Sequence, residues 1–449
     1  MTRTLHVLAP QAVLPGSSKP QPATITVDLD RGVFVEVAEG VQAVQEGAEV
    51  LRLDPSHVLL PGLIDTHVHL NQPGRTEWEG FATGTLAAAS GGVTTLIDMP
   101  LNSIPPTTTI PNLETKRSAA RETGVYTDVG FWGGIIPGNA GDLKGLLDQG
   151  AKGFKCFLIE SGVDEFPCVD EQDLIKACDA LEGTSALILF HAELGSTADH
   201  PHSDPTNYST FLDSRPESLE TDALALILRL ARRYPSLRFH IVHLSASSAL
   251  PLIRRARSED GVSNLTVETC FHYLSLSAAD IPTNATAFKC CPPIRDDGNR
   301  QKLIDAVVDG TIDFVVSDHS PCIPELKAGD FMSAWGGVSG LGLGLSLLTT
   351  TIGDRVGLPR ITELLGSRQA KQVGLQGKKG ELKKGLDADF VVFDPTETRT
   401  VSLDDLRFKN KVSPYLGREL RGWVKQTYLR GQLIWDGQSP SSSPLGTLL

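Results

Sequence analysis

Residues 60–69 end in two histidines whose spacing suits metal binding. The stretch reads Leu-Pro-Gly-Leu-Ile-Asp-Thr-His-Val-His, and its last part has the form Asp65-x-His67-x-His69. A β-strand places alternate residues on one face, so these three side chains are expected to project together. Two imidazoles on one face can hold a divalent metal ion. The alternative, two surface histidines after a strand end, is weakened by further potential ligands downstream.

Those further ligands lie near the ends of other strand-like segments. Strand-like runs are predicted at 63–69, 93–98, 127–132, 152–157, 186–191, 238–243, 264–269 and 312–318, with amphipathic helical segments between most of them. Eight strands alternating with helices are typical of a (β/α)8 barrel, whose chemistry lies at the carboxyl ends of the strands. Six ionisable side chains are then expected at one mouth: His67, His69, Lys155, His191, His243 and Asp318.

Such a set of side chains can hold two divalent ions and a bridging hydroxide, which is a strong nucleophile at neutral pH. Lys155 is cationic at its ordinary pKa of about 10.4 and repels metal in that form. Its amine can react with carbon dioxide to give an anionic carbamate with one oxygen for each metal. A salt bridge inside the barrel explains Lys155 equally well. Asp318 can ligate a metal and carry a proton to a leaving nitrogen, or it can cap a helix.

Both ends of the chain look β-rich, whereas the alternating pattern occupies the middle. We expect residues 1–60 and 381–449 to form one small β-sandwich domain, with residues 439–444 as a loose tail. Residues 61–380 are expected to form the barrel. The predicted fold class is therefore α/β, a (β/α)8 TIM barrel with a composite β-sandwich domain.

The net charge limits which kinds of partner we expect, and the cysteine content limits the expected cellular compartment. The 449 residues carry a formal charge of −13, which argues against nucleic-acid and anionic membrane partners. The seven cysteines include no Cys-x-x-Cys pair, and an odd number of reduced thiols fits a cytoplasmic protein. We expect no signal peptide, because the first six residues lack an apolar core.

The motif at residues 60–69 resembles the metal motif of the cyclic amidohydrolases, which include dihydroorotase, dihydropyrimidinase (hydantoinase) and allantoinase. Residues 71–81, 98–103, 153–157, 316–321, 334–337 and 411–415 are similar to the allantoinase version of the pattern. The resemblance runs from about residue 58 to residue 431. The chain departs from it at Phe271, where many relatives have proline, and at Cys291, where many have serine.

The resemblance implies two divalent ions per subunit, with zinc favoured, and commonly a homotetramer. It assigns His67, His69, Lys155 and Asp318 to one ion, and Lys155, as N6-carboxylysine, with His191 and His243 to the other. It implies that a metal-bridging hydroxide hydrolyses the cyclic amide bond of allantoin to give allantoate, with Asp318 as the catalytic proton carrier. The nearest alternative is a hydantoinase or dihydropyrimidinase acting on another cyclic ureide. A non-catalytic scaffold of the same fold is the more distant one.

Substrate contacts are harder to place. Dihydroorotase has an arginine two positions after its second motif histidine, which binds the substrate carboxylate, and Asn71 stands at that position here. Asn71 suits a neutral ureide better, and the alternative for nearby Arg75 is a salt bridge within its own loop. Asn102 is a candidate substrate contact or equally a turn former. Cys291 is a candidate contact through its backbone.

The remaining histidines are weaker candidates. His240 is expected to face away from His243, and His319 is expected to orient Asp318. Four others are interpreted as structural or exposed: His57, His200, His202 and His272.

Overall fold

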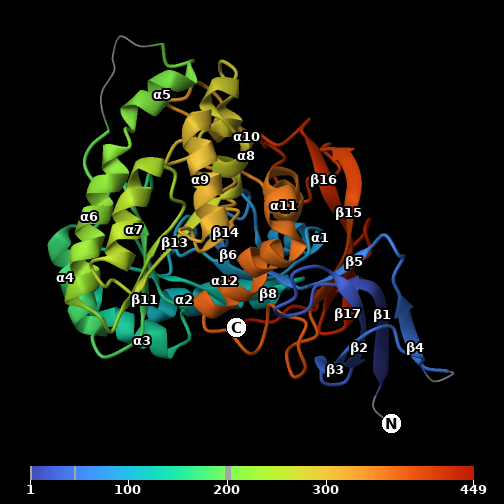
Figure 1. Cartoon of the computed structure of the whole chain (residues 1–449). Helices are drawn as coiled ribbons and strands as arrows, with labels where there is room; N and C mark the ends of the chain where they lie inside the picture. The colour runs from blue at the N-terminus through green and yellow to red at the C-terminus, as the bar shows by residue number, and fades with distance from the viewer. Residues whose placement is uncertain (1–2, 45–46, 198–203) are drawn as a thin grey trace.

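The eight strand-like segments in the middle of the chain all form β-strands. They are β6 (Leu63–Val68), β7 (Val93–Asp98), β8 (Asp128–Phe131), β10 (Phe154–Phe157), β11 (Leu187–His191), β12 (Arg238–Ile241), β13 (Leu265–Cys270) and β14 (Phe314–Val316). The structure is a computed structural model that describes residues 3–44, 47–197 and 204–449. Figure 1 shows these strands inside a layer of helices, beside a second, β-rich region.

Parallel pairing closes the strands into a barrel. One run of strands is β6-β7-β8, and the other leads from the short β9 (Gly133–Gly134) through β10, β11, β12 and β13 to β14. The runs join where the amide of Lys152 donates to the carbonyl of Phe131 at 2.9 Å, and where Val68 bridges His319. Because parallel strands in a closed barrel share one polarity, all their carboxyl ends open at the same mouth.

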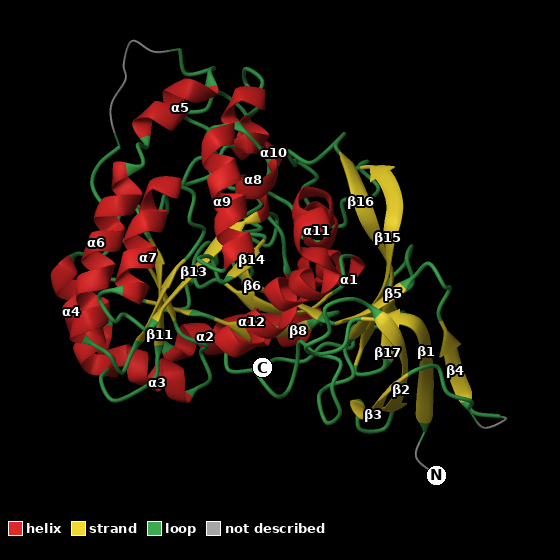
Figure 2. Ribbon diagram, in the orientation of Figure 1, coloured by secondary structure: helices red, strands yellow, loops and turns green. Residues whose placement is uncertain are grey.

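The strands are apolar because helices cover them. Every residue of β6, β10 and β11 is buried, as expected for parallel strands with both faces covered. The helices are α1 (Phe81–Ser90), α2 (Ile110–Thr123), α3 (Leu143–Asp148), α4 (Glu171–Leu181), α5 (Tyr208–Ser214), α6 (Ser218–Arg233), α7 (Leu250–Ser258), α8 (Phe271–Ser275), α9 (Asp297–Asp309), α10 (Pro324–Lys327), α11 (Gly344–Thr362) and α12 (Arg368–Gln372). Figure 2 shows most of the longer ones around the outside of the strands.

Helix α6 illustrates how sequence pattern sets this packing. Leu224, Ile227 and Leu230 recur at the spacing of one helix face and are buried, whereas Arg232 and Arg233 lie in its last turn, where cations suit the helix dipole. Truncation of the fully buried Ile227 to alanine is expected to cost about 2–5 kcal/mol, because the barrel wall around it cannot collapse fully.

Strands from both chain ends form one composite sheet, as predicted. Its members are β1 (Thr4–Ala12), β2 (Gln21–Asp28), β3 (Val33–Glu39), β4 (Glu49–Arg52), β5 (Val58–Pro61), β15 (Phe390–Thr400), β16 (Glu419–Leu429) and β17 (Gln432–Trp435). The antiparallel pair β5–β15 joins the N-terminal strands to the C-terminal ones. The sheet has a hydrophobic cluster of its own, which includes Ile25, Phe34 and Phe390. The domain boundaries at residues 60 and 380 stay predictions.

The prediction of a loose tail at residues 439–444 is wrong. Pro440 bridges Trp435, and the amide of Ser441 donates to the carbonyl of Ile434 at 3.0 Å. Beyond this segment, Leu448 pairs with Val129 of β8. The Ser and Pro residues of this segment suggested a loose tail, because composition does not show which backbone hydrogen bonds form. In the described part of the chain, no helix is both long and apolar enough to span a membrane.

Candidate active site

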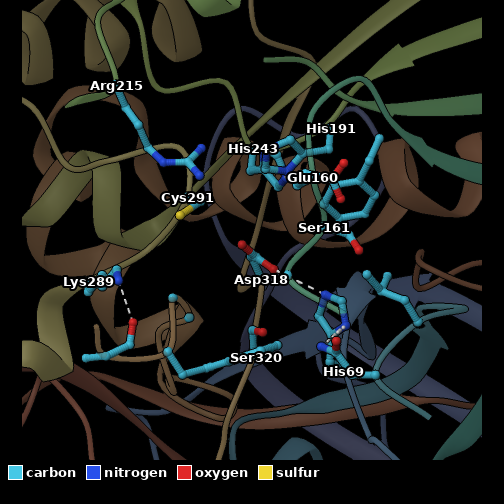
Figure 3. Close-up of a pocket in the computed structure, with 18 of the residues that line it drawn as sticks. His69, Glu160, Ser161, His191, Arg215, His243, Lys289, Cys291, Asp318 and Ser320 are labelled. Atoms are coloured by element: carbon cyan, nitrogen blue, oxygen red, sulfur yellow. Dashed lines mark hydrogen bonds and ion pairs between the residues drawn. The ribbon is translucent and has the colours of Figure 1, made fainter. Parts of the chain in front are cut away.

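A cavity of about 400 Å³ lies at the carboxyl ends of the barrel strands, and all six side chains that were expected at the mouth line it. His67 belongs to β6, Lys155 to β10 and His191 to the end of β11. His69 directly follows β6, and His243 and Asp318 are the second residues after β12 and β14. Figure 3 shows His69, His191, His243 and Asp318 converging in this cavity. The barrel topology therefore gathers residues that lie up to 251 positions apart in the sequence.

The backbone is strained where two of these side chains leave their strands. His243 has φ 40° and Asp318 has φ 43°, a region that residues with a Cβ rarely adopt. Such strain persists only where the surrounding structure holds it, and it concentrates at functional sites. Here it turns each side chain into the cavity immediately after its strand ends.

His67, His69 and Asp318 form the first half of the site. The Nε2 atoms of His67 and His69 lie 3.1 and 3.6 Å from Oδ1 of Asp318. The possible ligand atoms of these three buried residues all lie within 4.8 Å of one another. Burial alone would raise the pKa of Asp318, but the adjacent His67 lowers it below its ordinary value. Asp318 is therefore an ionised carboxylate at neutral pH.

Lys155, His191 and His243 form the second half. Nδ1 of His191 lies 3.0 Å from Nε2 of His243, and Nδ1 of His243 is buried without a hydrogen-bond partner among the described residues. Lys155 is buried, and its Nζ lies 5.2 Å from the centre of the Phe157 ring. Burial lowers the pKa of Lys155 to about 8. An amine with this pKa is partly neutral at neutral pH, which is the form that reacts with carbon dioxide.

The protonation of the histidines suits divalent metal ions. Burial lowers the pKa of His69 to about 3, and it lowers the pKa of His191 and of His243 as well. His67 is the exception, because Asp318 and Glu268 outweigh burial there and raise its pKa. Neutral imidazoles keep a lone pair for a metal, and the orphaned Nδ1 of His243 lacks any partner that the described residues supply. The donor set of four imidazoles, a carboxylate and a lysine therefore fits the expected metal centre.

Glu268 of β13 is a part of the site that the sequence reading missed. Its Oε1 lies 2.5 Å from Nδ1 of His67, and its Oε2 lies 3.0 Å from Nε2 of His240. A carboxylate on the outer nitrogen of a histidine fixes the ring and makes its inner nitrogen a better ligand. His240 lies outside the cavity, and it reaches the site through this shared carboxylate. The sequence did contain a signal for Glu268, namely an acidic residue inside a run that was predicted to be a buried strand.

Glu193 supports the other half in the same way. Nε2 of His191 donates to Oε2 of Glu193 at 2.7 Å, and Nη1 of Arg215 donates to the same oxygen at 2.6 Å. Glu193 is fully buried, and the His191 and Arg215 contacts outweigh burial and lower its pKa. Because Arg215 also lines the cavity, it links the cavity wall to His191. The His-x-Glu spacing could have revealed Glu193.

Asp65 and His319 do not act as the sequence reading expected. The carboxylate of Asp65 turns away from the cavity and accepts the amide protons of His67 and Ser317 at 3.2 and 3.3 Å. The pairing of β6 with β7 shifts after Asp65, which breaks the simple alternation of faces. His319 contacts Glu79 at 3.3 Å through Nε2 rather than Asp318, because its Nδ1 faces the amides of residues 340 and 341.

The loop after β6 also differs from expectation. Asn71 does not line the cavity, because its side chain donates to the carbonyl of Pro321 at 3.2 Å. The argument from Asn71 to a neutral substrate therefore stays a prediction. Arg75 pairs with Glu165 of another loop, and it also donates to the carbonyl of Asn102 at 2.9 Å. Long-range partners, rather than neighbours within the loop, decide both orientations.

Asn102 and Cys291 both line the cavity. The amide nitrogen of Asn102 lies 3.2 Å from Nδ1 of His69, and its φ of 68° shows that it also forms the turn. His272 is buried, and burial lowers its pKa to about 4. His57 is partly exposed. His200 and His202 lie outside the described residues.

Comparison with known proteins agrees with this geometry. Residues 58–434 match the Amidohydrolase family. The chain belongs to the amidohydrolase family. It is 45% identical to the allantoinase of Saccharomyces cerevisiae, over 99% of this chain and 98% of that protein. It is 46% identical to the allantoinase of Streptomyces avermitilis, over 100% of this chain and 97% of that protein.

A solved hydantoinase structure has the same fold. The L-hydantoinase (dihydropyrimidinase) from Arthrobacter aurescens superimposes with a TM-score of 0.88 at 25% identity, covering 100% of this chain and 99% of that one. The amidohydrolase fold, a TIM barrel with a β-sandwich domain, is therefore the fold of this protein, and the expected fold class is confirmed.

Proposed function

We propose that this amidohydrolase hydrolyses the ring amide bond of allantoin to give allantoate. The observation that supports the proposal most directly is the convergence of His67, His69, Lys155, His191, His243 and Asp318 in one cavity. Relatives named allantoinase, matched over nearly the whole chain, support the choice of substrate.

Divalent ions held by these six residues would acidify a water molecule and polarise the amide carbonyl. The chain itself supplies the proton transfer and the orientation. Asp318 is ionised, so it can accept a proton from the attacking water and later donate it to the leaving ring nitrogen. Glu268 and Glu193 hold His67 and His191 in fixed rotamers.

The direct test is a kinetic comparison of cyclic ureides. Purified protein supplied with divalent metal should turn over allantoin with a higher kcat/KM than hydantoin, dihydrouracil or dihydroorotate. Absence of allantoin turnover at full metal occupancy would refute the proposal. A higher kcat/KM for hydantoin or dihydrouracil would favour the second candidate, a hydantoinase or dihydropyrimidinase, which the likeness to the Arthrobacter aurescens enzyme supports.

The scaffold alternative has little support. A non-catalytic relative has no need for ionisable side chains at all six positions, and the strained backbone at His243 and Asp318 would serve no purpose in it. Metal analysis with no metal in the purified protein, together with no turnover on any cyclic ureide, would revive this alternative.

Four finer properties belong to the same proposal. We propose zinc as the metal and N6-carboxylysine at position 155, which the buried position and lowered pKa of Lys155 support. We propose a cytoplasmic location, supported by seven free cysteines. We also propose a homotetramer, as in the family resemblance. Metal analysis, intact mass under carbon dioxide and light scattering test the metal, the carbamate and the assembly in turn.

A further inference from the structure

One wall of the cavity carries cationic side chains that form no ion pair or hydrogen bond with the six proposed metal ligands. Figure 3 shows Arg215, Cys291 and Lys289 on one side of the cavity and His69 and His191 on the other. Burial lowers the pKa of Lys289, and the charge of Arg215 lowers it further. All of these residues line the cavity.

Lys289 has one hydrogen-bond donor to spare. Its ammonium donates to the carbonyls of Met332 and Ala334 at 3.0 and 2.5 Å, and an ammonium has three N–H donors. Within residues 3–44, 47–197 and 204–449, no oxygen or nitrogen accepts the third one, although the Phe211 ring, which also lines the cavity, has its centre 5.2 Å from the ammonium. The residue is only 7% exposed, but it lines the cavity, so a bound ligand can reach this donor. A buried donor without an acceptor is costly, and a cavity ligand would remove that cost.

Two neighbouring groups repeat the same pattern. Arg215 uses Nη1 on Glu193, and its other guanidinium N–H groups have no acceptor among the described side chains and carbonyls. The indole Nε1 of Trp335 is buried and has no partner in the described part of the chain. Trp335 also lines the cavity and packs edge-on against Trp78, with ring centres 4.9 Å apart. This wall therefore has several hydrogen-bond donors without an acceptor, and an oxygen atom of a bound ligand can accept from them.

Lys327 shows that a buried lysine next to this wall need not have a hydrogen-bond donor without an acceptor. It is also a buried lysine, but its ammonium lies 2.5–3.5 Å from four backbone carbonyls, those of residues 286, 289, 335 and 337. It does not line the cavity. Lys327 holds the segments together, whereas Lys289 both holds residues 332–334 and presents a donor to the cavity.

We infer that Lys289, with Arg215 beside it, binds the carbonyl oxygen of the ureido arm of the substrate and thereby selects a ring that carries this arm. The inference rests on the proposed function, because it takes allantoin as the substrate. The metal-ligand side of the cavity serves the ring amide, and the cationic wall serves the substituent. Lys289 is then a specificity-determining residue for the same reaction.

The test compares a ligand with the arm and one without it. The kcat/KM for allantoin is measured together with the inhibition constant of hydantoin, the same ring without the arm, in wild type, Lys289→Met and Lys289→Arg. Lys289→Met should lower kcat/KM for allantoin by about 10- to 100-fold, since it removes a charged hydrogen bond, and it should change the hydantoin constant by less than about twofold. Lys289→Arg, which keeps a cationic donor, should restore most of the loss.

Lys327→Met is the matched control. It frees carbonyls of the same segments without removing a group from the cavity, so it should lower thermal stability and affect allantoin and hydantoin by similar factors. An unimpaired Lys289→Met, or equal losses on the two ligands, would overturn the inference. Hydantoin that does not compete with allantoin in wild type would also count against it, because ring and arm would then lack separate subsites. Wild type without allantoin turnover would instead refute the proposed function.

Discussion

Two fully buried lysines of this protein are in opposite electrostatic situations. Lys155, at the cavity, has no hydrogen-bond acceptor within the described residues, and burial lowers its pKa to about 8. Lys379, where the barrel meets the composite sheet, lies 2.7 Å from Asp128, 3.0 Å from Asp387 and 2.6 Å from Asp389. Burial lowers the pKa of Lys379 too, but the three carboxylates outweigh burial and raise it.

The comparison separates stabilising charges from functional ones. The carboxylate oxygens of the aspartate cluster lie within 4.8 Å of one another, as do the ligand atoms of His67, His69 and Asp318. Lys379 already neutralises the aspartates from inside the chain, and Arg430 adds two bonds to Asp128 at 2.7 and 2.8 Å. At the mouth of the barrel, Asp318 contacts His67 and His69, and no described lysine or arginine forms an ion pair with it. Proximity of acidic groups alone therefore does not identify a metal site, because a buried cation of the chain can already compensate their charge.

The largest effect is expected from a substitution of Lys155, the functional lysine of the two. Lys155→Ala should lower kcat for allantoin by at least about 10³-fold, since it removes the proposed bridging ligand. Short carboxylic acids should partly restore turnover, because they can occupy the space of the carbamate. The control is Lys152→Ala, two residues before β10, which should retain turnover. Full activity of Lys155→Ala would show that Lys155 is a structural residue like Lys379.

Asp318→Asn should be almost as severe but should act on a different step. We expect kcat to fall by about 10²- to 10⁴-fold, because the amide cannot carry the proton, whereas much of the metal stays bound. Metal analysis beside steady-state kinetics on one preparation measures both. Near-normal turnover would mean that another group carries the proton.

Lys379→Met tests the stabilising side. Removing one partner leaves buried carboxylates uncompensated, so the free energy of unfolding should fall by about 3–5 kcal/mol. Denaturant titration measures the change, and kcat per folded molecule should stay close to that of wild type. Asp387→Asn should cost less, since Asp387 is the most exposed of the three aspartates. A marginal cost for Lys379→Met would weaken the contrast.

The smallest expected effect is a gain in the free energy of unfolding, whereas Lys379→Met should lower it. In metal-free protein in buffer without carbon dioxide, the folded chain releases the Lys155 proton near pH 8, whereas the unfolded chain keeps it to about pH 10.4. This group therefore makes stability rise with pH across that window, and below it the buried ammonium destabilises the fold. Lys155→Met should raise the free energy of unfolding at pH 7 by roughly 3 kcal/mol, with the gain vanishing near pH 10.4. A loss of stability at pH 7 would show that Lys155 is paired.

Much of the framework was predictable from local pattern. Apolar runs bounded by glycine and helical segments predicted all eight barrel strands, because a parallel strand covered on both faces must be apolar along its length. The six ligand candidates were predictable for the same reason, since a polar residue at the end of such a run must lie at the barrel mouth.

Other features depend on contacts between distant segments. Glu268 and Glu193 were missed because their partners, His67 and the pair His191 and Arg215, come together only in the closed barrel. The partner of Asn71 could not be predicted either, because the carbonyl that it contacts belongs to Pro321, 250 positions away.

The sequence by itself determined which elements form and which side chains stand at their ends, because strand periodicity and burial are local properties. Only the tertiary structure decided which buried charges find a partner. Lys379 forms ion pairs with the three aspartates of the cluster, whereas Lys155 has no hydrogen-bond acceptor within the described chain. The physical reason is that desolvation depends on burial, whereas its compensation depends on a group brought from elsewhere in the fold.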